Sequence, residues 1–203
     1  MKLLQANDDA IKAAAFLIKE GGVVVYPTET VYGIGCVPSD PDAAQRICEI
    51  KERADKPLPL ICSDIEMVRK IVVMTSAAEK LAARFWPGPL TIVLASKVKY
   101  STWVTHGAST LGVRVTEHPV AQKLAKAVGG VIVSTSANIS GGEPARSAQE
   151  AKEIFMNKVD IILDGGPSPC SESSTVVDLT GGDVWLLRKG PITGEQIMAV
   201  LRA

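Results

Sequence analysis

Apolar residues recur at helical spacing in several segments of the chain, and each segment begins at a residue that can cap a helix. The clearest example begins at Asn7 or Asp8 and ends at Gly21. Its apolar positions fall on one helical face and are Ile11, Ala14, Ala15 and Ile18. Further helices are predicted after Ser39 or Asp40, after the capping-box pairs Ser63–Glu66, Ser147–Glu150 and Thr193–Gln196, and over residues 76–85 and 119–128.

Short runs rich in valine, isoleucine and leucine lie between these segments and are bounded by turn residues, a pattern typical of strands. The predicted strands cover residues 23–26, 58–62, 90–95, 111–115, 131–134, 159–163, 175–179 and 184–187. Several are apolar on both faces, which favours interior strands covered by helices. The last two are joined by Thr-Gly-Gly-Asp at residues 180–183, which predicts a hairpin. We therefore expect an α/β fold with a mixed sheet.

Length and composition are those of an ordinary globular protein. The 203 residues suit one domain, and because no linker or repeat interrupts them we expect a single domain over residues 1–203. Aromatic residues make up only 4%, so the core must rest on smaller apolar side chains. The 22 basic residues balance the 22 acidic ones, which excludes nucleic-acid binding by bulk charge. Any site for an anion must therefore be built locally.

Several common motifs for nucleotide and metal binding are missing from the sequence. It contains no phosphate-binding P-loop motif, no complete dinucleotide fingerprint and no His-Glu-x-x-His metal motif. The four cysteines include no Cys-x-x-Cys pair and only two histidines accompany them, so we expect no protein-bound metal site. No signal peptide or membrane span is evident, and we predict a cytoplasmic protein with reduced thiols and no membrane partner.

The first candidate for chemistry is a group of cations near the predicted second helix. Lys51, Arg53 and Lys56 lie within six residues of one another. They suit a polyphosphate, although complementing the dipole at a helix end would explain part of the pattern. A second candidate is the Thr/Glu/Gly-rich loop at residues 27–33, which follows a buried-looking strand. The ends of such strands are where α/β sheets place ligands.

Two further groups follow or interrupt strands. Residues 134–138 read Ser-Thr-Ser-Ala-Asn directly after an apolar strand, and such polar groups are costly in a core unless hydrogen-bonded. Arg114 lies inside another apolar run, so it either pairs with an acidic side chain or binds an anionic ligand. Ser174 and Arg188 flank the last hairpin. Together these groups favour binding and orienting a multiply charged anion, as in nucleotidyl transfer.

These motifs, taken in order, resemble the YrdC family. The resemblance is carried by residues 27–35 (Pro-Thr-Glu-Thr-Val-Tyr-Gly-Ile-Gly), the Lys51-x-Arg53 pair, residues 56–60 (Lys-Pro-Leu-Pro-Leu), residues 86–91 (Trp-Pro-Gly-Pro-Leu-Thr) and residues 134–138. It implies the short, single-domain form of the family, with an open, strongly twisted mixed sheet, flanking helices and a concave basic face. The sequence departs from the family pattern in two places, since Ala54 stands where many relatives have proline and Ile61-Cys62 stands in the region where some relatives have a histidine.

The resemblance also implies an activity. The family joins L-threonine, bicarbonate or CO2, and ATP into threonylcarbamoyl-AMP and pyrophosphate, for modification of tRNA next to the anticodon. Lys51 and Arg53 would act in catalysis. The implied ATP-binding residues are Lys51, Arg53, Lys56, Thr110, Ser136, Asn138 and Arg188. The implied threonine-binding residues are Thr30, Arg114, Ser134 and Ser174.

The same resemblance implies Mg²⁺ carried with ATP rather than held by the protein. The expected partners are a tRNA threonylcarbamoyl transferase that receives the product, and tRNA or double-stranded RNA. An alternative function is a double-stranded RNA or ribosome-associated binding protein that uses the same concave face, although the zero net charge weighs against it. A third is a carbamoyl-transfer domain such as those of hydrogenase maturation proteins, which are much longer chains.

Overall fold

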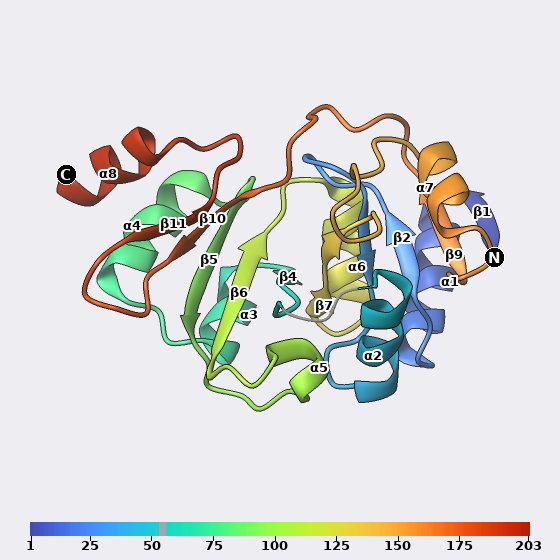
Figure 1. The fold of residues 1–203 in the computed structure, drawn as a ribbon, viewed down its shortest axis with the longest axis horizontal. Coiled ribbons are helices and arrows are strands. Elements are labelled where there is room, and N and C mark those ends of the chain that lie inside the picture. Colours follow the sequence, from blue (N-terminus) through green and yellow to red (C-terminus); the bar gives the residue numbers. More distant parts are fainter. Residues whose placement is uncertain (53–55) are drawn as a thin grey trace.

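Two mixed β-sheets carry the structure, a computed structural model that describes residues 1–52 and 56–203 (Figure 1). The five-stranded sheet has the order β1 (Lys2–Gln5), β9 (Ile161–Asp164), β2 (Val24–Tyr26), β3 (Gly33–Gly35), β8 (Thr135–Ser136). The six-stranded sheet has the order β11 (Trp185–Arg188), β10 (Thr175–Asp178), β5 (Leu90–Ala95), β6 (Thr110–Val115), β4 (Leu60–Cys62), β7 (Val131–Val133). The predicted α/β class is therefore confirmed, with the strands divided between two sheets.

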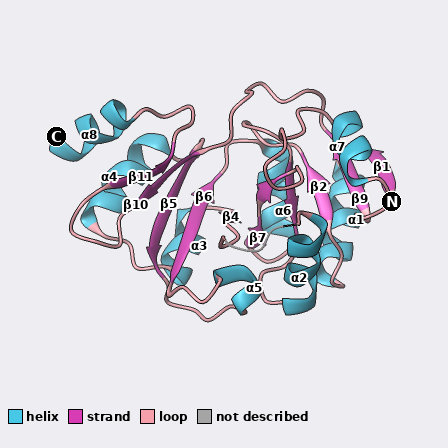
Figure 2. Cartoon of the chain, in the orientation of Figure 1, coloured by secondary structure: helices cyan, strands magenta, loops and turns pink. Residues whose placement is uncertain are grey.

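Helices cover both sheets. They are α1 (Asp8–Lys19), α2 (Pro41–Ile50), α3 (Ile65–Ile71), α4 (Ser76–Phe85), α5 (Thr102–Thr105), α6 (Pro119–Ala127), α7 (Ala148–Phe155) and α8 (Gly194–Arg202). Figure 2 shows α4 and α8 at the end of the molecule that holds β10 and β11, and α1 and α7 at the opposite end with β1 and β9. Among the described residues, no helix combines the length and the apolar character that crossing a bilayer requires.

Most predicted helix starts are confirmed by their caps. Asn7 and Asp40 accept hydrogen bonds from the first turns of α1 and α2, and Thr193 forms a complete capping box with Gln196. The cap predicted at Ser63 is wrong by one residue, because the carboxylate of Asp64 accepts the hydrogen bond from the backbone of Met67. The predicted strands and the antiparallel hairpin of β10 and β11 are present, with ends shifted by one or two residues.

One stretch of chain belongs to both sheets. β7 pairs with β4 in the six-stranded sheet, and β8, two residues further on, pairs with β3 in the five-stranded sheet. Ser134 lies between them, and its backbone N–H donates to the carbonyl of Pro59 at 2.8 Å. The sheets are therefore joined edge to edge by residues 131–136, and the polar side chains of this stretch lie at the junction.

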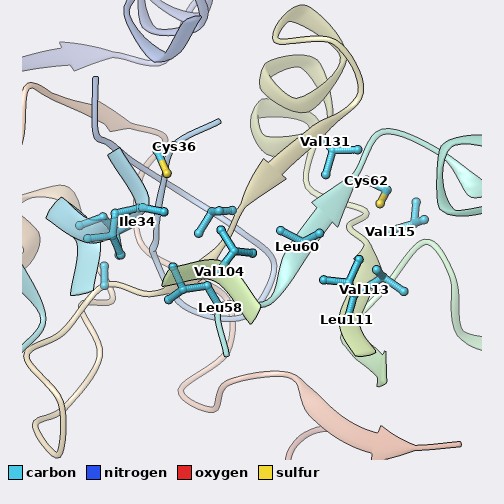
Figure 3. Close-up of a cluster of buried hydrophobic side chains, with 14 of the residues drawn as sticks. Ile34, Cys36, Leu58, Leu60, Cys62, Val104, Leu111, Val113, Val115 and Val131 are labelled. Atoms are coloured by element: carbon cyan, nitrogen blue, oxygen red, sulfur yellow. The ribbon is translucent and has the colours of Figure 1, made fainter. Parts of the chain in front are cut away.

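A single cluster of buried apolar side chains draws on both sheets. Figure 3 shows part of it, with Ile34 of β3, Leu60 of β4 and Val113 of β6 among the labelled side chains. A second cluster packs α1 and α6 against the strands from the other side. Because the first cluster spans the junction, the relative placement of the two sheets is fixed by core packing as well as by the backbone.

The close approach of β3 to the shared strand leaves no room for a side chain at Gly35. A Cβ atom there would lie 2.0 Å from the carbonyl oxygen of Val133 and 3.1 Å from the hydroxyl of Tyr26. The contact with backbone cannot be relieved by a rotamer change, so the strands must separate. This glycine is therefore required for the junction.

We expect Gly35→Ala to lower the free energy of unfolding by about 2 kcal/mol or more, as overpacking against backbone does. Gly182→Ala is the matched control, because a Cβ at Gly182 meets nothing within 4 Å, and its effect should stay within about 0.5 kcal/mol. Urea unfolding of both variants makes the comparison. Equal stability of the two variants would contradict the tight junction.

Candidate functional site

A cavity of about 900 Å³ lies against the face of the six-stranded sheet. Its floor comes from β5, β6 and β10, and its walls come from the segment after α2, the loop after β8 and the end of β11. Six of the residues predicted to bind ATP line it, and these are Lys51, Lys56, Thr110, Ser136, Asn138 and Arg188. The seventh, Arg53, lies outside the described residues. The cavity has the size of a pocket for a nucleotide-sized ligand.

A smaller recess of about 60 Å³ adjoins this cavity at the junction of the two sheets. All four residues predicted to bind threonine line it, and these are Thr30, Arg114, Ser134 and Ser174. The cavity and the recess share Pro59, Thr91, Ser136 and Arg188 in their walls. The fold therefore brings the two predicted groups of residues together into adjacent spaces.

Lys51 is the most deeply buried cation of the site, with 1% of its surface exposed. Its ammonium donates to the backbone carbonyls of Ser136 and Asn138 and to the side-chain oxygen of Asn138, the last two at 2.8 and 3.2 Å. Its own carbonyl accepts a hydrogen bond from Ser140 at 2.8 Å. These contacts tie the end of α2 to the loop that follows β8, so Lys51 positions that loop.

Asn138 completes the internal structure of the loop. Its amide nitrogen donates to the carbonyls of Ile139 and Gly142, both at 2.8 Å, while its oxygen accepts from the hydroxyl of Ser136 at 2.7 Å. A loop cross-linked in this way keeps its shape without a ligand, which reduces the conformational entropy lost on binding. The dense polar run at residues 134–138 thus forms a fixed wall shared by cavity and recess.

Arg114 contributes a buried guanidinium to the lining of the recess. It is 6% exposed, donates to the hydroxyl of Thr30 at 3.2 Å, and lies 3.6 Å from a carboxylate oxygen of Glu29. The first alternative raised by the sequence is confirmed, since Arg114 has an acidic neighbour. Because Arg114 also lines a pocket, binding of an anionic ligand stays a prediction. The sequence did not predict that Glu29, in the loop at residues 27–33, is the acidic neighbour of Arg114.

Arg188 lines both spaces. Its guanidinium donates to the carbonyl and the hydroxyl of Ser174, both at 2.9 Å, and that hydroxyl lies 2.8 Å from the hydroxyl of Thr91. Thr91 was missed as a site residue, because in the sequence it is one position of an apolar strand. Arg188 lies at the boundary of the two spaces, where it can contact ligands in either one.

Burial controls protonation around the recess. It raises the pKa of the Tyr26 phenol, which lies near Ser134 and Arg114 and donates to the carbonyl of Val133 at 3.2 Å. Burial also lowers the pKa of His118, while nearby Glu29 acts in the opposite direction. Because both shifts favour the neutral forms, neither Tyr26 nor His118 adds a charge beside the recess.

Fold and site together define an α/β protein with a cavity rich in cations and hydroxyls beside a small hydroxyl-lined recess. The chain belongs to the Sua5/YciO/YrdC family, since the model of that family, described as telomere recombination, matches residues 16–190. This membership confirms the resemblance seen in the sequence.

Individual relatives agree with the family match. The threonylcarbamoyl-AMP synthase of Pyrococcus abyssi is 41% identical over 193 residues, which are 94% of this chain and 57% of that relative. The protein of the same name from Halorhodospira halophila is 42% identical over 158 residues, 76% of this chain and 82% of its own length. The crystal structure of P. abyssi Sua5 complexed with L-threonine superposes with a TM-score of 0.92 at 38% identity. That match covers 98% of this chain and 60% of the Sua5 chain, so the chain spans less than two thirds of the P. abyssi proteins.

The buried ammonium of Lys51 yields a prediction about the loop. Lys51→Met keeps most of the volume but leaves the carbonyls of the loop without their donor, and we expect a loss of about 2–4 kcal/mol in unfolding free energy. Hydrogen exchange of residues 136–142 should increase at the same time, because the loop is no longer tied to α2.

Lys123→Met is the control for this variant. Lys123 pairs with Asp8 at 2.6 Å on the surface, where its side chain is 59% exposed, so its replacement should cost less than about 1 kcal/mol. Unchanged exchange of the loop in Lys51→Met would show that Lys51 does not hold it.

Proposed function

We propose that the protein is a nucleotidyltransferase that forms threonylcarbamoyl-AMP and pyrophosphate from L-threonine, bicarbonate or CO2, and ATP. The observation that carries this proposal is that the cavity and the recess adjoin each other and have different linings. The cavity combines nucleotide size with three cationic side chains, and the recess combines a buried arginine with several hydroxyls. The names of the curated relatives support the same activity.

In this proposal the recess binds threonine. The guanidinium of Arg114 takes the carboxylate, as a charge-assisted hydrogen bond in a site of low solvent exposure. The hydroxyls of Thr30, Ser134 and Ser174 are available for the polar groups of the amino acid. The P. abyssi Sua5 structure, which contains L-threonine, supports this choice of ligand.

The cavity would bind ATP. Lys56 and Arg188 provide positive charge at its walls, and the fixed loop that contains Ser136 and Asn138 provides hydroxyl, amide and backbone groups for phosphate or ribose. Arg53 belongs to the same proposal, on its position in the sequence alone. Mg²⁺ belongs to the same proposal, as an ion that would enter with the nucleotide and screen the phosphate charge.

The chemistry that follows needs positioning and charge neutralisation. The amine of threonine adds to the carbon of CO2 and loses a proton, which gives a carbamate anion. A carbamate oxygen then attacks the α-phosphorus of ATP, and the bond from that phosphorus to the bridging oxygen breaks to release pyrophosphate. Because two anionic groups must meet, the barrier is lowered by cations already in place, and Arg188 at the boundary suits this role.

The product would be passed to a tRNA threonylcarbamoyl transferase, and a cytoplasmic location with reduced thiols belongs to the same proposal. None of the four cysteines forms a disulfide within the described residues, and three of them are buried. Binding of tRNA or double-stranded RNA without catalysis is the outcome that would favour the alternative function.

The test is incubation of the protein with ATP, Mg²⁺, bicarbonate and one amino acid at a time, with pyrophosphate and the adenylate product followed by mass spectrometry. We expect threonylcarbamoyl-AMP with L-threonine, and a rate lower by at least about tenfold with L-valine, because a methyl group leaves recess hydroxyls unpaired. Equal rates with both amino acids would contradict the recess assignment. Salt-sensitive RNA binding without pyrophosphate release would contradict the enzymatic function.

A further inference from the structure

Glu29 lies behind the recess without lining it. Its side chain is 7% exposed, as is that of Arg114, and one of its carboxylate oxygens is 3.6 Å from the guanidinium. The other oxygen accepts a hydrogen bond from the hydroxyl of Thr116. The oxygen that faces Arg114 accepts no hydrogen bond from any described residue. Glu29 is therefore a buried negative charge held at fixed distance behind a buried positive one.

This arrangement compensates the charge of Arg114 without using its N–H groups. A distance of 3.6 Å permits Coulomb attraction but is too long for a hydrogen bond. Within the described part of the chain the guanidinium donates one hydrogen bond, to Thr30. Arg114 thus keeps N–H donors for a ligand in the recess. The negative charge of Glu29 at the same time cancels part of its attraction for anions.

The cancellation has unequal effects on different anions. A phosphate dianion in the recess would be repelled by Glu29 about twice as strongly as a single carboxylate, since Coulomb energy scales with charge. An amino acid carries an ammonium as well as a carboxylate and is repelled least. The recess must distinguish a carboxylate from a phosphate, because the adjacent cavity is proposed to hold phosphates and shares Ser136 and Arg188 with the recess.

We propose that Glu29 sets the anion selectivity of the recess, acting through Arg114 so that the recess accepts an amino-acid carboxylate and rejects phosphate. The inference rests on the proposed function for the identity of the amino acid. Its physical content, the selectivity between carboxylate and phosphate, rests on the contacts of Glu29, Arg114 and Thr116 alone. Removing the charge of Glu29 while keeping its shape should open the recess to phosphate.

The experiment measures binding by calorimetry to the whole protein, with L-threonine alone, inorganic phosphate alone, and threonine in the presence of phosphate. In Glu29→Gln we expect phosphate to bind about tenfold more tightly than in the wild type or better, the effect of one nearby charge at partial burial. Phosphate should then compete with threonine in the variant, whereas in the wild type the threonine affinity should be unaffected by phosphate.

Two further variants separate charge from structure. Thr116→Val removes a hydrogen bond of Glu29 but keeps its charge, and should retain the selectivity of the wild type. Glu29→Gln combined with Arg114→Gln removes both charges and should show no gain in phosphate binding. Because Glu29→Gln leaves Arg114 without its counter-charge, the variant should be less stable, and phosphate should raise its melting temperature more than that of the wild type.

The inference is overturned if Glu29→Gln gains neither phosphate affinity nor stabilisation by phosphate, or if the double variant gains as much as the single one. Failure of the wild type to bind L-threonine would instead count against the proposed function. The comparison of phosphate binding between variants would still decide the role of Glu29 in that case.

Discussion

The structure depends on one stretch of chain, residues 131–136, that pairs first in one sheet and then in the other. Successive side chains of a strand point to opposite faces. At the junction of the two sheets, the polar side chains of this stretch therefore lie toward the pockets, while its valines stay in the core. Ser134 and Ser136 reach the pockets in this way. Thr30 reaches the same place from the loop that leads into β3, the partner of β8.

Two buried cations near this junction have different roles. Lys51 is held by carbonyls and an amide oxygen and fixes the shape of the loop at residues 136–142. Arg114 is balanced by Glu29, a carboxylate at ion-pair distance, and keeps donors for a ligand. Buried charges are tolerated only when compensated, and the two forms of compensation lead to different roles. One cation stabilises the site and the other is available to act in it.

The fold class and most residues of the site could be predicted from the sequence. The α/β class followed from periodicity, and the predicted site residues followed largely from the resemblance to the YrdC family, whereas Thr91 was missed. The Gly-Ile-Gly strand β3 and the two-residue strand β8 were not predicted, because neither has the run of β-branched or aromatic residues typical of strands. Both depend on pairing with each other at the junction. The inward orientation of Lys51 and the position of Glu29 behind Arg114 depend on long-range contacts that no local pattern encodes.

In the proposed function, the cavity and the recess form one site for two ligands. A crystal structure of the protein with L-threonine and a non-hydrolysable ATP analogue tests it most directly. We expect the threonine carboxylate against the guanidinium of Arg114, the triphosphate in the cavity beside Ser136 and Arg188, and the amine of threonine facing the α-phosphate. Threonine bound away from Arg114, or a nucleotide outside the cavity, would contradict the account.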